Sequence, residues 1–486
     1  MIKLIVRQAN WGILGSVFGF SIGFFVKIYL IDIVGIEQWG RYVSAQTFAG
    51  AMSTLLSFGI PWIIIKYSSS ILDNDINKAQ QLIRKIFRVS AFASCLFLVL
   101  TYFLSPFLDV YVYKEIDDFS LILLVVSINV PIGIFMGVIT SLYRSVFRIK
   151  EIMLYGTFII VPLRAVITYF TFMYTDNILY FVGIEIFTSF VSLGMLYYMF
   201  NKDALSIFTI TKDNSFKVDS EIKKYGRKMY INSLVSFIAG QSLSFILSIM
   251  LPSSYIGVYS ILLTVSGVAL FLINNLNTIF APAISKLYGE GKIDELSALF
   301  KKTTFIINLI AFPFFISIII FSKDILLLFD DTAKLVVYYP YLYIVVFARV
   351  FRIMVGAAGS VLVMANLEKY ELNLQYLKAV LINVLAIILI LEYELLGVCV
   401  LFTISTFIEE AYRLIVIHNK LKINPFSKSF FLLILLSIPF IFAGMNINIS
   451  FKLYHFIVIP ILLYSFYALI FFKEIKLIYF QILKKE

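Results

Sequence analysis

The stretch "VGIEQWGRY", residues 34–42, is a short polar turn between two long apolar runs, and its position decides how the chain folds. Apolar runs of about 20 residues, the length of helix that crosses a ~30 Å bilayer core, recur along the 486-residue chain. The composition agrees, with 61% hydrophobic residues, only 14% charged residues and a mean hydropathy of +0.95. We therefore predict an all-α, polytopic membrane protein.

We predict about fourteen transmembrane helices, separated by short polar segments. Their approximate limits are 11–34, 42–65, 89–112, 119–143, 152–174, 177–200, 229–250, 255–283, 303–322, 336–364, 371–391, 396–417, 429–446 and 455–472. The longest polar stretch, 201–228, divides the first six spans from the next six. We expect an N-terminal lobe in 1–200, a linker in 201–228, a C-terminal lobe in 229–420, and two further helices with a tail in 421–486.

Lysine and arginine are distributed very unevenly between the two sets of connecting segments. With the N-terminus placed inside, thirty of the forty basic residues fall on the cytoplasmic side and five fall outside. Cytoplasmic loops carry such an excess, so both termini and the linker are predicted to be cytoplasmic. The net charge of +11 follows from this topology, so no nucleic-acid partner is needed to explain it, and contact with anionic membrane lipids is expected.

An internal repeat relates the two predicted lobes. At an offset of 217 residues, "WGRY" at 39–42 falls on "IGVY" at 256–259, and Gly50 falls on Gly267. At an offset of 219, Gly137 meets Gly356 and Lys150 meets Lys369. Six spans separate the copies, so both lobes enter the membrane with the same orientation. They are predicted to be parallel repeats related by an axis along the membrane normal, which is an architecture of transporters.

Several stretches resemble the Wzx-type polysaccharide flippases, which move lipid-linked oligosaccharides and belong to the multidrug/oligosaccharidyl-lipid/polysaccharide exporter superfamily. "GIEQWGRY" at 35–42 looks like the first hairpin of that family, and residues 256–304, from "IGVYS" to "KKTT", look like its central block. Residues 356–390 and 395–414 resemble its tenth to twelfth spans. The resemblance covers residues 1–420 and marks the family better than the substrate.

The resemblance implies a carrier in the bacterial inner (cytoplasmic) membrane. Its cargo would be an undecaprenyl-pyrophosphate-linked oligosaccharide, moved by alternating access from the cytoplasmic to the outer face for O-antigen, capsule or exopolysaccharide synthesis. Contacts with other polysaccharide assembly proteins are also expected. Two alternatives within the same superfamily stay open, a drug or organic-cation extruder and a lipid II flippase. A scaffold without transport activity is a third.

Ionisable residues inside the predicted spans, with Arg41 in the outer turn, are the candidate site, because a charge inside a span costs about 2.5–3.5 kcal/mol or more to insert. Arginine and lysine suit the phosphate oxygens of a pyrophosphate. Arg349 and Arg352 are three residues apart, so they share a helix face and suit a two-point grip. The candidate substrate-binding residues are Lys27, Arg41, Arg164, Arg349, Arg352 and Lys378; the candidate charge partners or ion-coupling residues are Glu185, Glu409 and Glu410.

Ion pairing is the structural alternative for most of these residues. Arg164 and Glu185 lie at similar depths on consecutive spans, as do Arg349 and Glu409, so either pair could be structural. Two further cations have a local explanation: Arg41 could pair with Glu37, and Lys378 could reach the cytoplasmic headgroups. Lys27 has no acid at helical spacing. We expect Lys27, Arg349 and Arg352 to face a water-filled cleft between the lobes.

No enzyme signature is found, and a catalytic function is not expected. The chain lacks the G-x-x-x-x-G-K-[ST] pattern of an ATP site. Its two histidines and two cysteines have no metal-ligand spacing, so no metal is predicted. No cofactor is expected, although transport could be coupled to a proton or sodium gradient.

Overall fold

The computed structural model describes residues 2–476 with the exception of 69–75, 115, 117, 147, 204–219, 269, 331, 447–454 and 475. The described residues form helices and turns, with no β-strand among them. Most of the expected linker, from 204 to 219, lies outside the described residues. The chain divides into two compact units, Met1–Val258 and Tyr259–Glu486. The lobe boundaries expected from the sequence remain a prediction.

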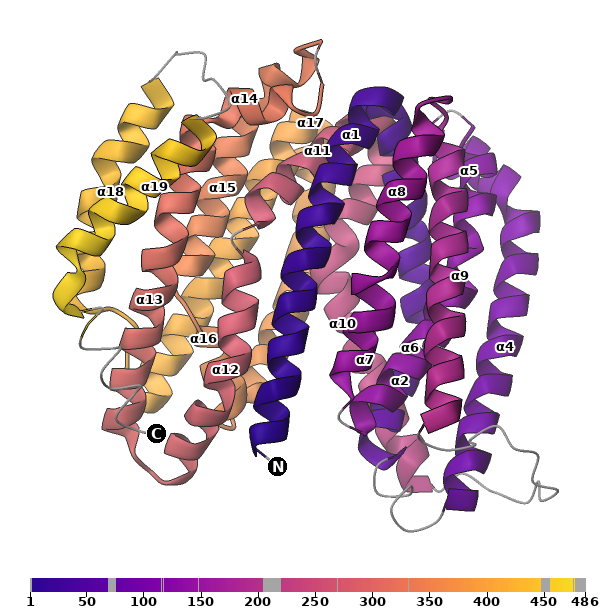
Figure 1. Cartoon of the computed structure of the whole chain (residues 1–486), viewed down its shortest axis with the longest axis horizontal. Helices are drawn as coiled ribbons and strands as arrows, with labels where there is room; N and C mark the ends of the chain where they lie inside the picture. Colours follow the sequence, from indigo (N-terminus) through magenta and orange to yellow (C-terminus); the bar gives the residue numbers. More distant parts are fainter. Residues whose placement is uncertain are drawn as a thin grey trace. The chain divides into compact units, whose positions relative to one another are not determined.

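The first unit is a bundle of long helices that run up and down, coloured indigo to magenta in Figure 1. Its elements are α1 (Ile2–Leu56), α2 (Ile60–Ile63), the π-helical turn η1 (Ile64–Ser68), α4 (Ile76–Phe107), η2 (Leu108–Val112), α5 (Phe119–Ser127), α6 (Asn129–Ser145), α7 (Ile149–Met153), η3 (Leu154–Phe158), α8 (Ile160–Phe172), α9 (Ile178–Asp203), α10 (Ser220–Met250) and the start of α11 (Ser253–Gly267).

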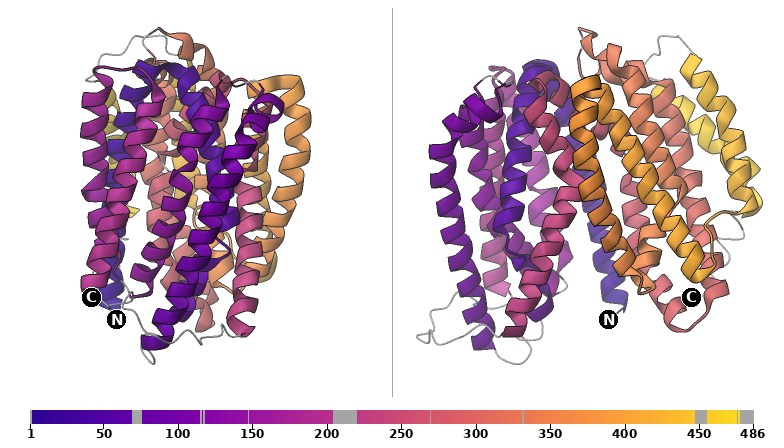
Figure 2. Two further views of the ribbon diagram at one scale, coloured as in Figure 1. Left: turned by 90° about the vertical axis from the view of Figure 1, so that its right-hand side faces the viewer. Right: turned by 180° about the vertical axis from the view of Figure 1, so that it is seen from behind.

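The second unit is also a bundle of long helices, and its colours in Figure 2 run from pink through orange to yellow. After the end of α11 it contains α12 (Leu270–Gly289), α13 (Ile293–Ile320), α14 (Ser322–Leu327), the 3-10 turn η4 (Lys334–Tyr338), α15 (Tyr339–Met354), α16 (Ala358–Met364), α17 (Glu368–Leu421), α18 (Lys428–Asn446) and α19 (His455–Ile470).

Two helices are long enough to cross a membrane twice, and each contains one residue with non-helical backbone angles. In α1 that residue is Gly35, with φ 80° and ψ 163°, a conformation that glycine adopts without a Cβ clash. In α17 it is Glu394, with φ 48° and ψ −127°. The chain reverses at both points, and each helix therefore supplies two antiparallel arms. The polar turn at 34–42 is the first of these reversals.

Ten helices in the described residues are long and apolar enough to span a membrane. Because α1 and α17 each supply two arms, and α11 with α12 and α19 cover two further expected spans, each predicted span coincides for most of its described residues with helix. The chain is therefore an all-α, polytopic membrane protein, as predicted. The correction is local: several spans are broken by bends and π-helical turns where one straight helix was expected.

Equivalent parts of the repeat form the core of each unit. In the first unit, Ile83, Val138 and Leu142 belong to one buried apolar cluster. In the second unit, residues at the offsets of the repeat, Phe300, Ala357 and Val361, belong to a corresponding cluster. The same helix faces are therefore buried in both units, which is what a duplicated bundle requires.

Candidate functional site

Arg164 and Glu185 form an ion pair in the first unit, between α8 and α9. The Nη1 atom of Arg164 lies 3.3 Å from Oε1 of Glu185. The rest of the guanidinium is also used, because Nε donates to Thr188 Oγ1 at 2.9 Å and Nη2 donates to Ser189 Oγ at 3.1 Å. Arg164 and Glu185 therefore form the structural ion pair that the sequence analysis gave as the alternative to substrate binding.

The second oxygen of Glu185 accepts three hydrogen bonds from other helices. Tyr42 Oη donates at 2.9 Å, Gln46 Nε2 at 2.8 Å and Asn129 Nδ2 at 3.4 Å. The sequence analysis did not single out these donors, although amide side chains inside apolar spans were a usable signal. Both oxygens of the partly buried Glu185 have hydrogen-bond or ion-pair partners, and this network joins α1, α6, α8 and α9.

A second charged cluster lies in the second unit, between the two arms of α17. Lys378 from the first arm pairs with Glu409 from the second arm at 2.5 Å, and their side chains are 13% and 7% exposed. The expectation that Lys378 reaches toward the headgroups is therefore wrong. The carboxylate of Glu409 stabilises the ammonium group of Lys378 inside the protein.

Arg413 is the centre of this cluster, although it was not among the candidate residues of the sequence analysis. Its guanidinium binds Glu409 at 2.7 Å and Glu410 at 2.8 Å, and it makes a two-pronged contact with Glu371 on the other arm. The side chain is only 9% exposed. This arrangement corrects the suggested pairing of Glu409 with Arg349, because Lys378 and Arg413 occupy the carboxylate of Glu409 instead.

Arg349 and Arg352 on α15 take part in none of the salt bridges found among the described residues. The guanidinium of Arg349 lies over the ring of Phe402, 4.6 Å from its centroid, and its Nε atom is buried without a hydrogen-bond partner. Arg352 is half-buried and acts electrostatically on both Glu409 and Glu410. Arg349 and Arg352 thus place two positive charges on α15, and Arg352 is the one near the carboxylates of Glu409 and Glu410.

The remaining two candidates lie on α1. Lys27 on the first arm is placed over the ring of Trp39, at 5.0 Å, across the reversal at Gly35. Arg41 pairs with Glu37 one turn earlier, at 2.7 Å, as the i, i+4 spacing had suggested. The side chains of Arg41 and Glu37 are 22% and 60% exposed, so this pair is a surface feature of the turn.

The sequence matches the family described as "Polysaccharide biosynthesis protein" over residues 32–329. The chain belongs to the polysaccharide biosynthesis protein family. This confirms the resemblance drawn from the hairpin and the central block. No curated protein matches the sequence.

Solved structures of transporters share the fold of this family member. A structure of the lipid II flippase MurJ in an inward closed conformation matches with a TM-score of 0.71 and 14% identity, over 95% of this chain and 98% of that chain. An inward-facing multidrug resistance MATE transporter of the MOP superfamily matches at 0.65 and 13%, over 88% and 96%. A MOP superfamily transporter from Pyrococcus furiosus, described as having a binding pocket of reversed polarity, matches at 0.59 and 16%, over 86% and 96%. At these identities the likeness concerns the fold.

Proposed function

We propose that the protein is a flippase that moves an undecaprenyl-pyrophosphate-linked oligosaccharide from the cytoplasmic to the outer face of the bacterial inner membrane. Alternating access of two repeated lobes would carry the headgroup while the lipid tail stays in the bilayer. The family match over residues 32–329 is the observation that carries this proposal. The transporter fold of the structural relatives supports it. The product would serve surface polysaccharide synthesis, and the protein itself would catalyse no reaction.

Arg349 and Arg352 are the residues proposed to meet the pyrophosphate. Within the described part of the chain neither arginine makes a salt bridge, whereas Arg164 and Lys378 each hold a carboxylate. An aromatic ring attracts a cation but leaves its charge available to an anion, so Arg349 keeps donors for phosphate oxygens. Lys27 remains a third candidate, and Arg41 would act at the outer mouth.

An organic-cation extruder is the less favoured alternative, because it needs acidic groups that can accept the cargo. Glu185, Glu409 and Glu410 all hold cations or hydrogen-bond donors of the protein itself. If transport is coupled to a proton or sodium gradient, these carboxylates are the groups that would exchange the ion. Lipid II remains an alternative cargo, since it also carries an undecaprenyl pyrophosphate.

Reconstitution tests the proposal directly. The purified full-length protein would be placed in liposomes that contain a fluorescent lipid-linked oligosaccharide, and transfer between leaflets would be followed by the accessibility of the sugar to an added lectin. Transfer above the rate of protein-free liposomes is expected. A rate equal to that of protein-free liposomes, with a folded protein and with either glycan or lipid II as cargo, would reject a flippase function. Extrusion of an organic cation by the same liposomes would favour the alternative.

A further inference from the structure

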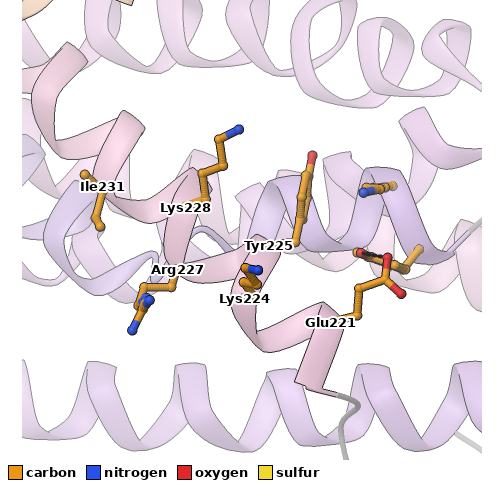
Figure 3. A pocket seen from close by; sticks show the side chains of 8 residues that line it. Glu221, Lys224, Tyr225, Arg227, Lys228 and Ile231 are labelled. Carbon is orange, nitrogen blue, oxygen red and sulfur yellow. Dashed lines mark hydrogen bonds between the residues drawn. The ribbon is translucent and has the colours of Figure 1, made fainter.

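A basic pocket lies at one end of the first unit, where η1 meets the beginning of α10. Its volume is about 390 Å³, and four of the eight residues that line it are cations: Lys66, Lys224, Arg227 and Lys228. Figure 3 shows Glu221, Lys224, Tyr225 and Lys228 following one another along α10. The remaining lining residues are Tyr67 and Ile231. Lys66 and the α10 lysines are far apart in the sequence, and the fold brings them to one cavity.

Close backbone contact holds the two walls of this pocket together. Gly59, before α2, has a φ of 67°, and a Cβ on it would lie 2.8 Å from the carbonyl oxygen of Gly226 on α10. A Cβ on Gly226 would in turn press on Ile63. Phe58 and Tyr230 pack beside this contact, with ring centroids 5.8 Å apart. The lysines of the two walls are therefore held near one another by packing, against their mutual repulsion.

Aromatic rings position Lys66 inside the pocket. Its ammonium group lies 4.1 Å from the ring centroid of Tyr225 and 5.0 Å from that of Tyr67. The two rings pack edge to face at 5.6 Å, and the hydroxyl of Tyr67 donates to Glu221 at 3.3 Å. Glu221 is the one acid among the eight lining residues, so the lining has a clear excess of positive charge. This arrangement suits an anion with several acceptor oxygens.

The position of the pocket indicates which anion it takes. Ile231, one turn beyond Lys228 on α10, is 45% exposed and begins the apolar part of the helix. On the other wall Trp62, one turn before Lys66, is 50% exposed, and tryptophan is enriched at membrane–water interfaces. The ligand would therefore meet cations on one side and a lipid-facing apolar surface on the other. A free phosphate would use only the first of these.

We propose that this pocket binds the phosphate of an anionic phospholipid in the cytoplasmic leaflet. Arg227 offers a planar fork to phosphate oxygens, and the lysines contribute mobile ammonium donors. Basic pockets between helices on the cytoplasmic side are suited to such headgroups. The bound lipid would join the end of η1 to the start of α10. This site is separate from the cargo site proposed above, and binding of a phospholipid does not depend on what the protein transports.

The test compares lipid binding by pocket and control variants of the full-length protein in detergent. Binding of a short-chain phosphatidylglycerol would be measured by native mass spectrometry, with phosphatidylcholine as the neutral reference. The pocket variant is Lys224→Ala with Lys228→Ala. The control variant, Lys223→Ala with Lys369→Ala, removes the same charge from exposed cations outside the pocket lining. We expect about tenfold weaker phosphatidylglycerol binding in the pocket variant and no more than about twofold in the control.

Three outcomes decide whether the proposal stands, and one of them identifies the source of the anion. Equal losses in the two variants would reduce the pocket to general surface electrostatics and overturn the proposal. Displacement of the lipid by millimolar inorganic phosphate, with the same affinity in an Ile231→Ser variant, would identify free phosphate as the ligand and also overturn it. Recovery of binding by Lys224→Arg with Lys228→Arg, in a protein that elutes as a single species, would support it, because charge and fold are then both retained.

Discussion

Gly40 and Gly257 pack reciprocally against each other's turn. A Cβ on Gly40 would overlap the carbonyl oxygen of Ser253, and a Cβ on Gly257 would overlap the carbonyl oxygen of Ile36. Ser253 lies 217 residues after Ile36, and Gly257 lies 217 residues after Gly40. Each contact is therefore the repeat image of the other, as expected for two copies of one turn related by a twofold axis. Glycine permits this approach of two backbones.

Substitution of either glycine with alanine should destabilise the protein. Because both neighbours are backbone atoms, the helices would have to move apart, which costs about 1–3 kcal/mol in a packed interior. The free energy of unfolding in detergent would be measured for Gly40→Ala and Gly257→Ala. Gly50→Ala and Gly267→Ala provide matched controls at repeat-equivalent positions, where a Cβ would have open space. Equal stability of all four variants would contradict the reciprocal contact.

Arg413→Ala should be among the most destabilising substitutions in the second unit. It leaves Glu409, Glu410 and Glu371 close together with one fewer cation, and removal of one partner from a buried ion pair costs about 3–5 kcal/mol. Thermal unfolding of the purified protein would measure the loss. An additional Glu410→Gln substitution should restore part of it, because Glu410 is the least exposed of the three acids. No recovery would indicate that Arg413 acts through packing alone.

The pair of Arg164 and Glu185 should behave as a structural unit. Arg164→Leu leaves a partly buried carboxylate without its cation, whereas Arg164→Leu combined with Glu185→Gln removes both charges and keeps an acceptor oxygen for the donors on α1 and α6. We expect the double variant to be more stable than the single variant, by about 1 kcal/mol or more. A double-mutant cycle on unfolding free energies measures this coupling. A coupling near zero would return both residues to the list of candidate cargo contacts.

Arg352→Ala should abolish polysaccharide export while leaving the protein level unchanged. The reason is the proposed contact of its guanidinium with the pyrophosphate. Arg352→Lys should retain part of the activity, because the charge survives while the planar fork is lost. Export would be measured by complementation of a deletion strain, with Lys369→Ala as a control that removes an exposed cation at the start of α17. Normal export by Arg352→Ala would assign Arg352 to the structural cluster around Glu409.

The predicted orientation can be tested with truncated fusions to a reporter that is active only in the cytoplasm. A fusion after Lys422, the residue that follows α17, should give a signal because twelve predicted spans precede it. A fusion after Asp330, which follows nine predicted spans, should not. The opposite pattern would invert the topology and place the basic pocket of Figure 3 on the outer side.

The sequence by itself determined the class of the protein, its spans and the repeat. These properties follow from local signals: runs of apolar residues long enough to cross a bilayer, polar turns between them, and matched turns at a fixed offset. It also suggested Arg41 with Glu37, since an i, i+4 pair depends only on helical periodicity. The pair of Arg164 and Glu185 could also be suggested from the sequence, for a different reason: the two residues lie at similar depths on consecutive spans.

The tertiary structure decided which charges meet across helices. Depth along the chain brought both Arg349 and Lys378 within reach of Glu409, but the rotation of each helix about its axis selected Lys378. The same rotation placed Arg413 among three carboxylates and turned Lys27 onto Trp39 across the bend at Gly35. A linear sequence fixes the height of a side chain in the membrane, whereas the direction in which it points around its helix is set by packing against residues elsewhere in the chain, as far away as Lys224 is from Lys66. Lys66 and Lys224 form one pocket for that reason, because Gly59 and Gly226 allow their backbones to touch.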